Sequence, residues 1–395
     1  MVYGIIVGNY IWEDVIMATD ETSSIERRNK GVALGITVAV IVSLIIVTGI
    51  TLGNRFEANH VENSPKESMN SPTDRVPGKG LPASAFYVAD NSGYILRVEI
   101  DGTMSIVAGN GNNKDRPVPG PATESPLRPG WLAVDSAGNV YATSNMHSVV
   151  KIATDGTLSI VAGGECDRSA PKLGCEMLPA GLAVDKQDNL FIADALGFIW
   201  KLTPEGQFSI VAGKRNYGTP TPGRATDSYM APLYLVIDSA ENVYFSDAES
   251  VWKMSANGDL SILAGVAGEM SAPGIAGRNS LSTKGIAVEA NGSLVIAETS
   301  TLYRLKPDGD FTRILNTGTE YAQVRVADLF VNGVAVDKEG NILIADGHGF
   351  VEQLSLQGEV TIVAGNGNLN DHPVIGVAND SPMAPVGIAI ANTNA

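Results

Sequence analysis

Cysteine, histidine and positive charge are scarce in this chain, and each shortage argues against a class of function. The 395 residues include two cysteines and four histidines, without the Cys/His spacing of a zinc finger. Acidic residues outnumber basic ones by 43 to 27, which gives a formal net charge of −16. This charge argues against a nucleic-acid partner, because phosphate binding needs a concentrated positive surface. G-x-S-x-G, H-E-x-x-H and P-loop motifs are also missing, so no standard nucleophile or zinc-protease set is present.

Long apolar runs are equally rare, with one exception near the N-terminus. Residues 31–53 carry no charge, and a helix of this length spans a hydrocarbon core of about 30 Å. Arg27, Arg28 and Lys30 directly precede the run, so the positive-inside rule places residues 1–30 in the cytoplasm and the rest outside. We predict a single-pass signal anchor in the cell membrane. A cleaved signal peptide is the alternative, but the run is long for one and no A-x-A site closely follows.

The segments on either side of the predicted anchor differ in character. Residues 54–82 are polar and rich in Asn, Ser, Pro, Glu and Lys, without apolar periodicity. This composition predicts a disordered tether. On the cytoplasmic side, residues 1–16 look unlike the polar stretch that follows them, so translation could start at Met1 or at Met17.

The remainder of the chain repeats one unit of about 50 residues. GLAVDKQDNLFIAD at 181–194 recurs with variations that begin at residues 131, 234, 285 and 333. A strand such as TLSIVAG (157–163) follows each copy, after a turn such as Asp155-Gly156. Each unit therefore predicts four strands, a to d, with a type I′ turn between c and d. Four-stranded units of this period predict the blades of a β-propeller.

The two ends of the repeat region complement each other. The first unit, residues 85–109, lacks strand a, whereas residues 387–391 are a strand a with nothing after it. Joining them completes a sixth blade and removes an unpaired edge. We therefore predict an all-β fold, a six-bladed β-propeller over residues 83–395, closed by the C-terminal strand 387–391 and preceded by a single transmembrane helix.

The repeated pattern GIAVD…GNVYIAD…VxKI…DGTxSIVAG, found over about residues 85–391, resembles NHL repeats of the long-loop bacterial and teneurin-like type. The resemblance implies the same six-bladed propeller. It is poorly specific for function, because NHL propellers include receptor ectodomains, adhesion modules, RNA binders and lyases.

The strand order separates two kinds of connection. In an antiparallel blade the a–b and c–d turns share one face, which we call the tight-turn face because these turns are short here. The b–c and d–a connections share the other, the long-loop face, which carries loops 110–130, 164–180, 214–233, 266–284, 318–332 and 366–386. Long loops are often functional, so this is the predicted binding face. Arg and Tyr dominate interface energetics, and the candidates on these loops are Arg128, Arg215, Tyr217, Tyr229 and Arg278.

Two further features belong to these loops. A pattern Gly-x-Ala-Thr/Asn-Glu/Asp-Ser occurs at 120–125, 223–228 and 376–381. It predicts a repeated side-chain-capped turn, with a repeated ligand subsite as the alternative. Cys166 and Cys175 lie nine positions apart in one loop. In an oxidising compartment they could form a disulfide, and two free thiols are the alternative.

Two sets of residues on this face could hold a metal. The strand-b ends are mostly acidic: Asp90, Ser144, Asp194, Asp247, Glu298 and Asp346. Such carboxylates accept backbone N–H groups in their own turns, or could hold a hard divalent cation. His147, His348 and His372 could bind zinc, as in peptide-amidating lyases with a similar propeller. A histidine before strand c is, however, common in NHL repeats. We predict no cofactor, and a divalent cation here is the alternative.

The function predicted from the sequence is a non-enzymatic binding module for a protein, peptide or glycan. The runner-up is a metal-dependent lyase or lactonase that uses the channel mouth, and a structural adhesion role is a third alternative. Gluconolactonase-type propellers hold their metal with acidic and amide residues in the central channel, and these ligands have no residue-by-residue match here.

Overall fold

The computed structural model describes ten segments: 81–145, 147–164, 177–214, 218–247, 249–267, 270–271, 281–316, 320–321, 324–325 and 329–391. All of them belong to the compact unit Ser68–Ala395, and the unit Met1–Glu67 lies outside the described residues. The predicted anchor at 31–53 therefore also lies outside them. Within the described segments, no helix has the length and apolar character needed to cross a membrane.

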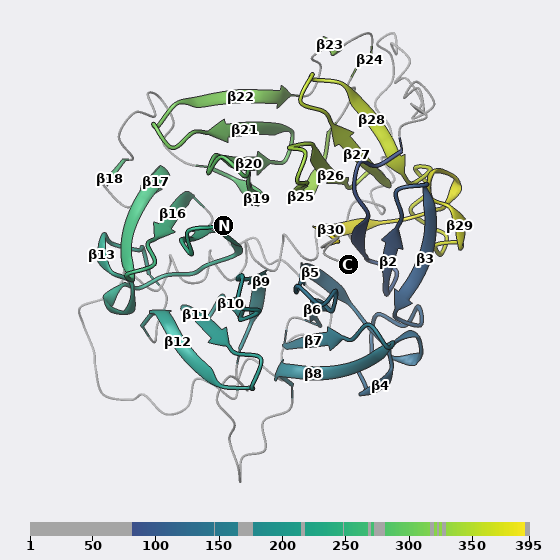
Figure 1. Cartoon of the computed structure of the whole chain (residues 1–395), viewed down its shortest axis with the longest axis horizontal. Helices are drawn as coiled ribbons and strands as arrows, with labels where there is room; N and C mark the ends of the chain where they lie inside the picture. Colours follow the sequence, from purple (N-terminus) through teal and green to yellow (C-terminus); the bar gives the residue numbers. More distant parts are fainter. Residues whose placement is uncertain are drawn as a thin grey trace, which may run out of the picture. The chain divides into compact units, whose positions relative to one another are not determined.

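Six antiparallel sheets form the blades of a propeller, with strand a innermost and strand d outermost (Figure 1). Blade 1 consists of β30 (Pro385–Ile390), β1 (Phe86–Asp90), β2 (Tyr94–Val98) and β3 (Thr103–Ala108). Blade 2 consists of β5 (Pro129–Val134), β6 (Val140–Ser144), β7 (Ser148–Ile152) and β8 (Thr157–Gly163). Blade 3 consists of β9 (Pro179–Val184), β10 (Leu190–Asp194), β11 (Phe198–Leu202) and β12 (Phe208–Gly213).

The other three blades repeat this arrangement. Blade 4 consists of β14 (Tyr234–Ile237), β15 (Val243–Ser246), β16 (Ser250–Met254) and β17 (Asp259–Ala267). Blade 5 consists of β19 (Thr283–Val288), β20 (Leu294–Glu298), β21 (Thr301–Leu305) and β22 (Phe311–Asn316). Blade 6 consists of β25 (Val331–Val336), β26 (Ile342–Asp346), β27 (Phe350–Leu354) and β28 (Val360–Ala364). The predicted six-bladed, all-β propeller is confirmed.

Short elements decorate the blades. The two-residue strands β4 (Gly120–Pro121), β13 (Gly223–Arg224) and β29 (Gly376–Val377) each pair with an outermost strand, and each precedes a 3-10 turn: η3 (Ala122–Glu124), η4 (Ala225–Asp227) and η5 (Ala378–Asp380). The strand β18 (Met270–Ser271) pairs with β17, and β23 (Glu320–Tyr321) pairs with β24 (Val324–Arg325).

The apolar pattern explains which strands lie inside. Strands β1, β6, β10 and β26 are buried at every position, because each lies between two strands of its sheet and between two neighbouring blades. In the outer strand β8 only two of the seven residues, Leu158 and Ala162, are buried. Six apolar clusters of described residues fill the interfaces between neighbouring blades.

The C-terminal strand completes the first blade. β30 pairs antiparallel with β1, with Val88 opposite Ile388. The backbone N–H of Ala391 donates to the carbonyl oxygen of Ala85 at 2.9 Å. The chain thus enters and leaves the propeller at neighbouring points of blade 1.

The predicted type I′ geometry of the c–d turns is wrong. A type I′ turn requires positive φ at both central residues, but only the glycine has it, with φ 83° at Gly156. The N–H of Gly156 donates to the carbonyl of Ala153, so the loop has three residues. Asp155 instead accepts hydrogen bonds from the N–H and hydroxyl of Thr157. These contacts fit a turn followed by a left-handed glycine, the common three-residue hairpin.

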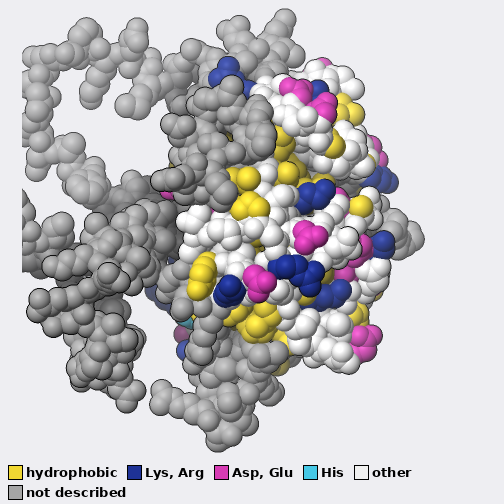
Figure 2. All heavy atoms as spheres, turned by 90° about the vertical axis from the view of Figure 1, so that its left-hand side faces the viewer, with side chains coloured by type: hydrophobic (Ala, Val, Ile, Leu, Met, Phe, Trp, Pro, Cys, Tyr) yellow, Lys and Arg dark blue, Asp and Glu magenta, His cyan; other side chains and the backbone are white. Residues whose placement is uncertain are grey.

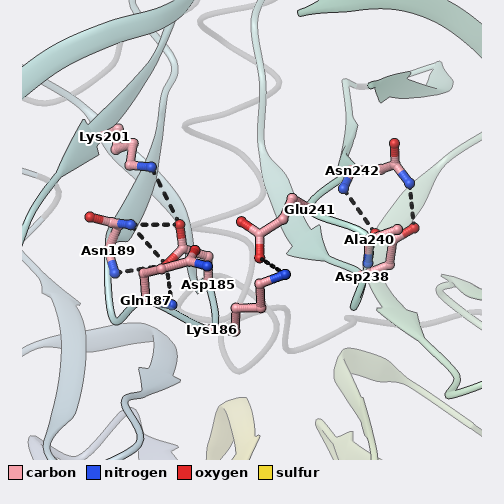
Figure 3. Close-up of polar contacts among 9 residues, drawn as sticks. All are labelled: Asp185, Lys186, Gln187, Asn189, Lys201, Asp238, Ala240, Glu241 and Asn242. Carbon is pink, nitrogen blue, oxygen red and sulfur yellow. Dashed lines mark hydrogen bonds and ion pairs between the residues drawn. The ribbon is translucent and has the colours of Figure 1, made fainter. Parts of the chain in front are cut away.

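The a–b turns of the tight-turn face are held by aspartates and linked between blades. In Figure 3, Asp185 accepts hydrogen bonds from the backbone N–H and the side-chain amide of Asn189 and forms an ion pair with Lys201. Lys186 of blade 3 forms an ion pair of 3.2 Å with Glu241 of blade 4. Glu241 has φ 64° at a position where blades 2, 5 and 6 have glycine and blade 3 has Asp188, with φ 61°. A residue that contacts the neighbouring blade thus occupies a strained conformation.

The chain also enters the propeller on the tight-turn face. The N–H of Ala83 donates to Gln353 at 3.1 Å, and the hydroxyl of Ser84 donates to Glu339 in the a–b turn of blade 6 at 3.2 Å. Strand β1 then runs from this face to the long-loop face. Since β30 runs the opposite way, both ends of the described propeller lie on the tight-turn face.

Candidate functional site on the long-loop face

The acidic strand-b ends connect each b–c turn to the loop that leads into the same blade. Asp194 is fully buried. It accepts hydrogen bonds from the N–H of Leu196 in its own turn, from the N–H of Leu178 in the incoming loop, both at 3.0 Å, and from Trp200 Nε1 at 2.9 Å. Corresponding bonds to incoming loops join Asp90 to Ala384, Glu298 to Ser282, Asp346 to Phe330 and Ser144 to Arg128. The predicted role as acceptors of N–H groups in their own b–c turns is confirmed for Asp90, Asp194, Asp247 and Asp346.

Burial shapes the electrostatics of this ring. It raises the pKa of Asp90 and of Asp247, and the N–H and O–H donors around each carboxylate oppose the shift in part. Within the described segments, no group of three or more His, Cys, Asp or Glu side chains could hold a metal ion. The cation site predicted as the alternative therefore has no supporting geometry among these residues.

The three candidate histidines have separate surroundings. His348 lies 2.8 Å from Asp346 through its Nδ1. His372 makes an edge contact with Tyr94, with ring centroids 5.8 Å apart. His147 is exposed at the end of the b–c turn of blade 2, directly before β7. All three are described, and they do not form a metal-holding group.

The repeated Gly-x-Ala pattern forms a link between neighbouring blades, which we call the loop latch. In loop 110–130 the N–H of Ala122 donates to the carbonyl of Gly156 in blade 2, while its own carbonyl accepts the N–H of Gly109 at the end of blade 1. The hydroxyl of Ser125 accepts the N–H of Val118 at 2.9 Å and closes the loop. Ala225 and Ala378 make the same link to Gly258 and Gly102, and Ser228 and Ser381 close their loops at 2.9 Å.

This shared geometry supports the interpretation of the pattern as a turn. The latch adds a short fifth strand at the outer edges of β3, β8 and β17. It therefore holds three long loops in defined conformations against the next blade.

Of the five predicted binding residues, two lie in the described segments. Tyr229 is 46 % exposed in the latch of blade 4, and the ammonium of Lys214 lies 5.4 Å from the centre of its ring. Arg128 is half-buried, and its backbone N–H donates to Ser144. Arg215, Tyr217 and Arg278, like both cysteines, lie outside the described residues. On the side of the molecule seen in Figure 2, basic, acidic and apolar side chains are intermingled.

Two aromatic rings close the central channel. The innermost register of strand a is glycine in four blades, at 181, 285, 333 and 387, and aromatic in two, Trp131 and Tyr234. These rings meet edge to face with centroids 4.5 Å apart. A Cβ built on Gly333 would lie 3.6 Å from the Trp131 ring, so the indole reaches from blade 2 to blade 6. A cavity of about 30 Å³ remains beside the rings. That is the room of about one water molecule.

Sequence reasoning missed this closure. The signal was present as two large residues in a column of glycines, but their convergence depends on the ring that six blades form. Burial of Tyr234 raises its pKa. The Trp131–Tyr234 pair, with Gly333 close to the indole, therefore forms an aromatic floor in the channel at this depth.

The mouth of the channel is the register just above this floor. One residue from each strand a, or in blade 4 the residue directly before it, is half-exposed here. We call these six the channel mouth: Val386, Gly130, Ala180, Leu233, Lys284 and Asn332. Four are apolar or lack a side chain, and the two polar residues lie in the adjacent blades 5 and 6.

Comparison with known proteins identifies the fold. No family model and no curated protein sequence matches the chain. An auxiliary nutrient binding protein from Bacteroides ovatus is similar in structure, with a TM-score of 0.51 and 12 % identity over 78 % of this chain and 72 % of that one. A streptogramin B lyase has a TM-score of 0.46 and 14 % identity, over 78 % of this chain and 98 % of that one. A gluconolactonase from Xanthomonas campestris has a TM-score of 0.43 and 15 % identity, over 73 % of this chain and 88 % of that one. Identities this low show the propeller fold alone.

Proposed function

We propose that this protein is a membrane-tethered, extracytoplasmic propeller of the NHL type that binds a protein, peptide or glycan through its long-loop face. The observation that carries the proposal is the position of the chain ends. Residues 81–85 run along the tight-turn face, where Ala83 and Ser84 contact blade 6. A tether that leaves from there would leave the long-loop face free to point away from the membrane.

The proposed anchor and tether would hold the propeller at a distance from the membrane. If residues 31–53 span the membrane, the polar segment 54–82 would separate the propeller from it. A flexible chain of this length has a root-mean-square extent of about 30 Å. This distance leaves room for a partner to approach the far face.

The loop latches support a binding role in a second way. A long loop that must become ordered on binding loses conformational entropy, which weakens affinity. The latches at Ala122, Ala225 and Ala378 hold their loops by backbone bonds to the next blade. These loops can therefore present side chains such as Tyr229 without that loss.

Photo-crosslinking from two exposed positions tests the proposal. A photoreactive phenylalanine derivative replaces Tyr229 on the long-loop face or, as the matched control, Leu356 on the tight-turn face, which is 62 % exposed. Both variants are expressed as the full chain in its own cells and irradiated. We expect a discrete crosslinked partner from position 229 and none from 356. Equal capture from both positions, or capture from 356 alone, would refute the proposed binding face.

A further inference from the structure

We propose that the channel mouth binds the C-terminal carboxylate of a peptide, with Lys284 and Asn332 as its polar contacts and the Trp131–Tyr234 floor beneath the last side chain. This proposal rests on the proposed function, since it names the group that the long-loop face recognises. It concerns the register above the aromatic floor.

Lys284 is an unusual residue for its position. It is half-buried, and none of the described residues forms an ion pair with it. Burial alone lowers its pKa, without a contribution from a neighbouring charge. The other five mouth residues are uncharged, in a protein whose net charge is −16. A partly buried ammonium is costly without an anion, so a ligand carboxylate at this place would offset that cost.

Asn332 occupies the same register in the adjacent blade 6. Its strand β25 packs closely on β19, because a Cβ built on Gly285 would lie 3.3 Å from the backbone nitrogen of Val334. The Asn332 amide nitrogen donates to the carbonyl of Pro385 at 2.9 Å, which orients the side chain. An amide nitrogen carries two donors, so one N–H remains for a ligand. Lysine and asparagine at equal registers of adjacent strands are therefore the two donors that we assign to the carboxylate.

The other channel-mouth residues determine which kind of ligand can carry the carboxylate, a peptide or a sugar acid. Ala180, Leu233 and Val386 have no side-chain hydrogen-bonding group, and the floor below is the Trp131–Tyr234 pair. Hydroxyl groups of an acidic sugar would lose water against these walls without finding partners, which is unfavourable. The apolar last side chain of a peptide has no hydrogen bonds to water to lose, and burial of its apolar surface there is favourable. The mouth therefore favours a peptide end over a sugar acid.

The test uses the purified full chain and three probes. These are the acetylated peptide Ac-Ala-Ala-Ala-Leu with a free C-terminus, the same peptide with a C-terminal amide, and glucuronate. Binding is measured by calorimetry for the wild type, Lys284→Met, and Lys338→Met as a control. Lys338 lies in an exposed a–b turn on the opposite face, with its side chain 68 % exposed. Methionine keeps the length of the lysine stem, and thermal melting checks that each variant is folded.

We expect the free-acid peptide to bind at least tenfold more tightly than the amide, and Lys284→Met to remove this preference. Lys338→Met should bind like the wild type. Equal binding of acid and amide, no binding of the peptide, or an unchanged preference in folded Lys284→Met would overturn the proposal. Binding of glucuronate in preference to the peptide would overturn the peptide assignment. A partner still captured from position 229 in the Lys284→Met background would refute this carboxylate site alone, whereas absence of any capture would refute the binding face itself.

Discussion

Replacement of Asp194 by alanine should destabilise the propeller much more than replacement of Ser144, which has the same register in blade 2. Both side chains are buried at the end of strand b. Asp194 accepts three hydrogen bonds, from Leu178, Leu196 and Trp200. Ser144 accepts one through its hydroxyl, from the N–H of Arg128. The comparison therefore isolates the number of donors that lose their acceptor.

The size of the effect follows from the burial of those donors. A buried donor without a partner costs about 1–3 kcal/mol. The indole N–H of Trp200 is buried, whereas the two backbone N–H groups are only partly buried and water can reach them in part. We expect Asp194→Ala to lower the free energy of unfolding by roughly 3–6 kcal/mol, and Ser144→Ala by about 1 kcal/mol. Asp194→Asn should fall between them, since one carbonyl oxygen survives.

Urea unfolding of the purified full chain, followed by tryptophan fluorescence, measures these differences. Trp200 itself lies in β11 and reports on the blade concerned. A loss in Asp194→Ala no larger than in Ser144→Ala would refute the reasoning that this carboxylate holds the loop and turn together.

Three further predictions concern topology, redox state and pH. Protease added to intact cells should remove the propeller and leave residues 1–30 protected, and a protected propeller would contradict the external location. Cys166 and Cys175 should resist thiol labelling until the protein is reduced, and full labelling of unreduced protein would exclude the disulfide. Because burial raises the pKa of Asp247, the folded state binds more protons than the unfolded state as pH rises from the ordinary carboxyl value to the raised one. Stability should therefore fall across that window. Asp247→Asn should flatten this slope in urea unfolding at several pH values, and an equal slope would contradict the assignment.

The repeat could be predicted from the sequence because its determinants are local. Alternation of apolar residues, a turn glycine and a terminal glycine recur in each unit and are enough to predict four strands. The missing first strand and the surplus last one indicated the sixth blade. The capping role of Asp194 and its equivalents was also predictable, since such residues commonly accept nearby backbone N–H groups.

Other features depended on three-dimensional relations that a local pattern does not contain. The c–d turns differ from the predicted type because a Gly after Asp155 is compatible with two hairpin geometries, and the length of the loop decides between them. The latch joins Ala122 to Gly156, which lies in the next blade. Trp131 and Tyr234 meet across the channel only because the blades form a ring. Lys284 likewise stands out only once its five companions at the channel mouth are known.

The central claim is that a partner binds the long-loop face. Its most direct test is hydrogen exchange of the full chain, measured with and without the partner identified by crosslinking. Backbone amides are compared with and without that partner, over every peptide of the propeller. The account predicts slower exchange in the long-loop connections, including loops 110–130, 214–233 and 366–386, and unchanged exchange in the a–b and c–d turns. Protection confined to the tight-turn face would contradict it.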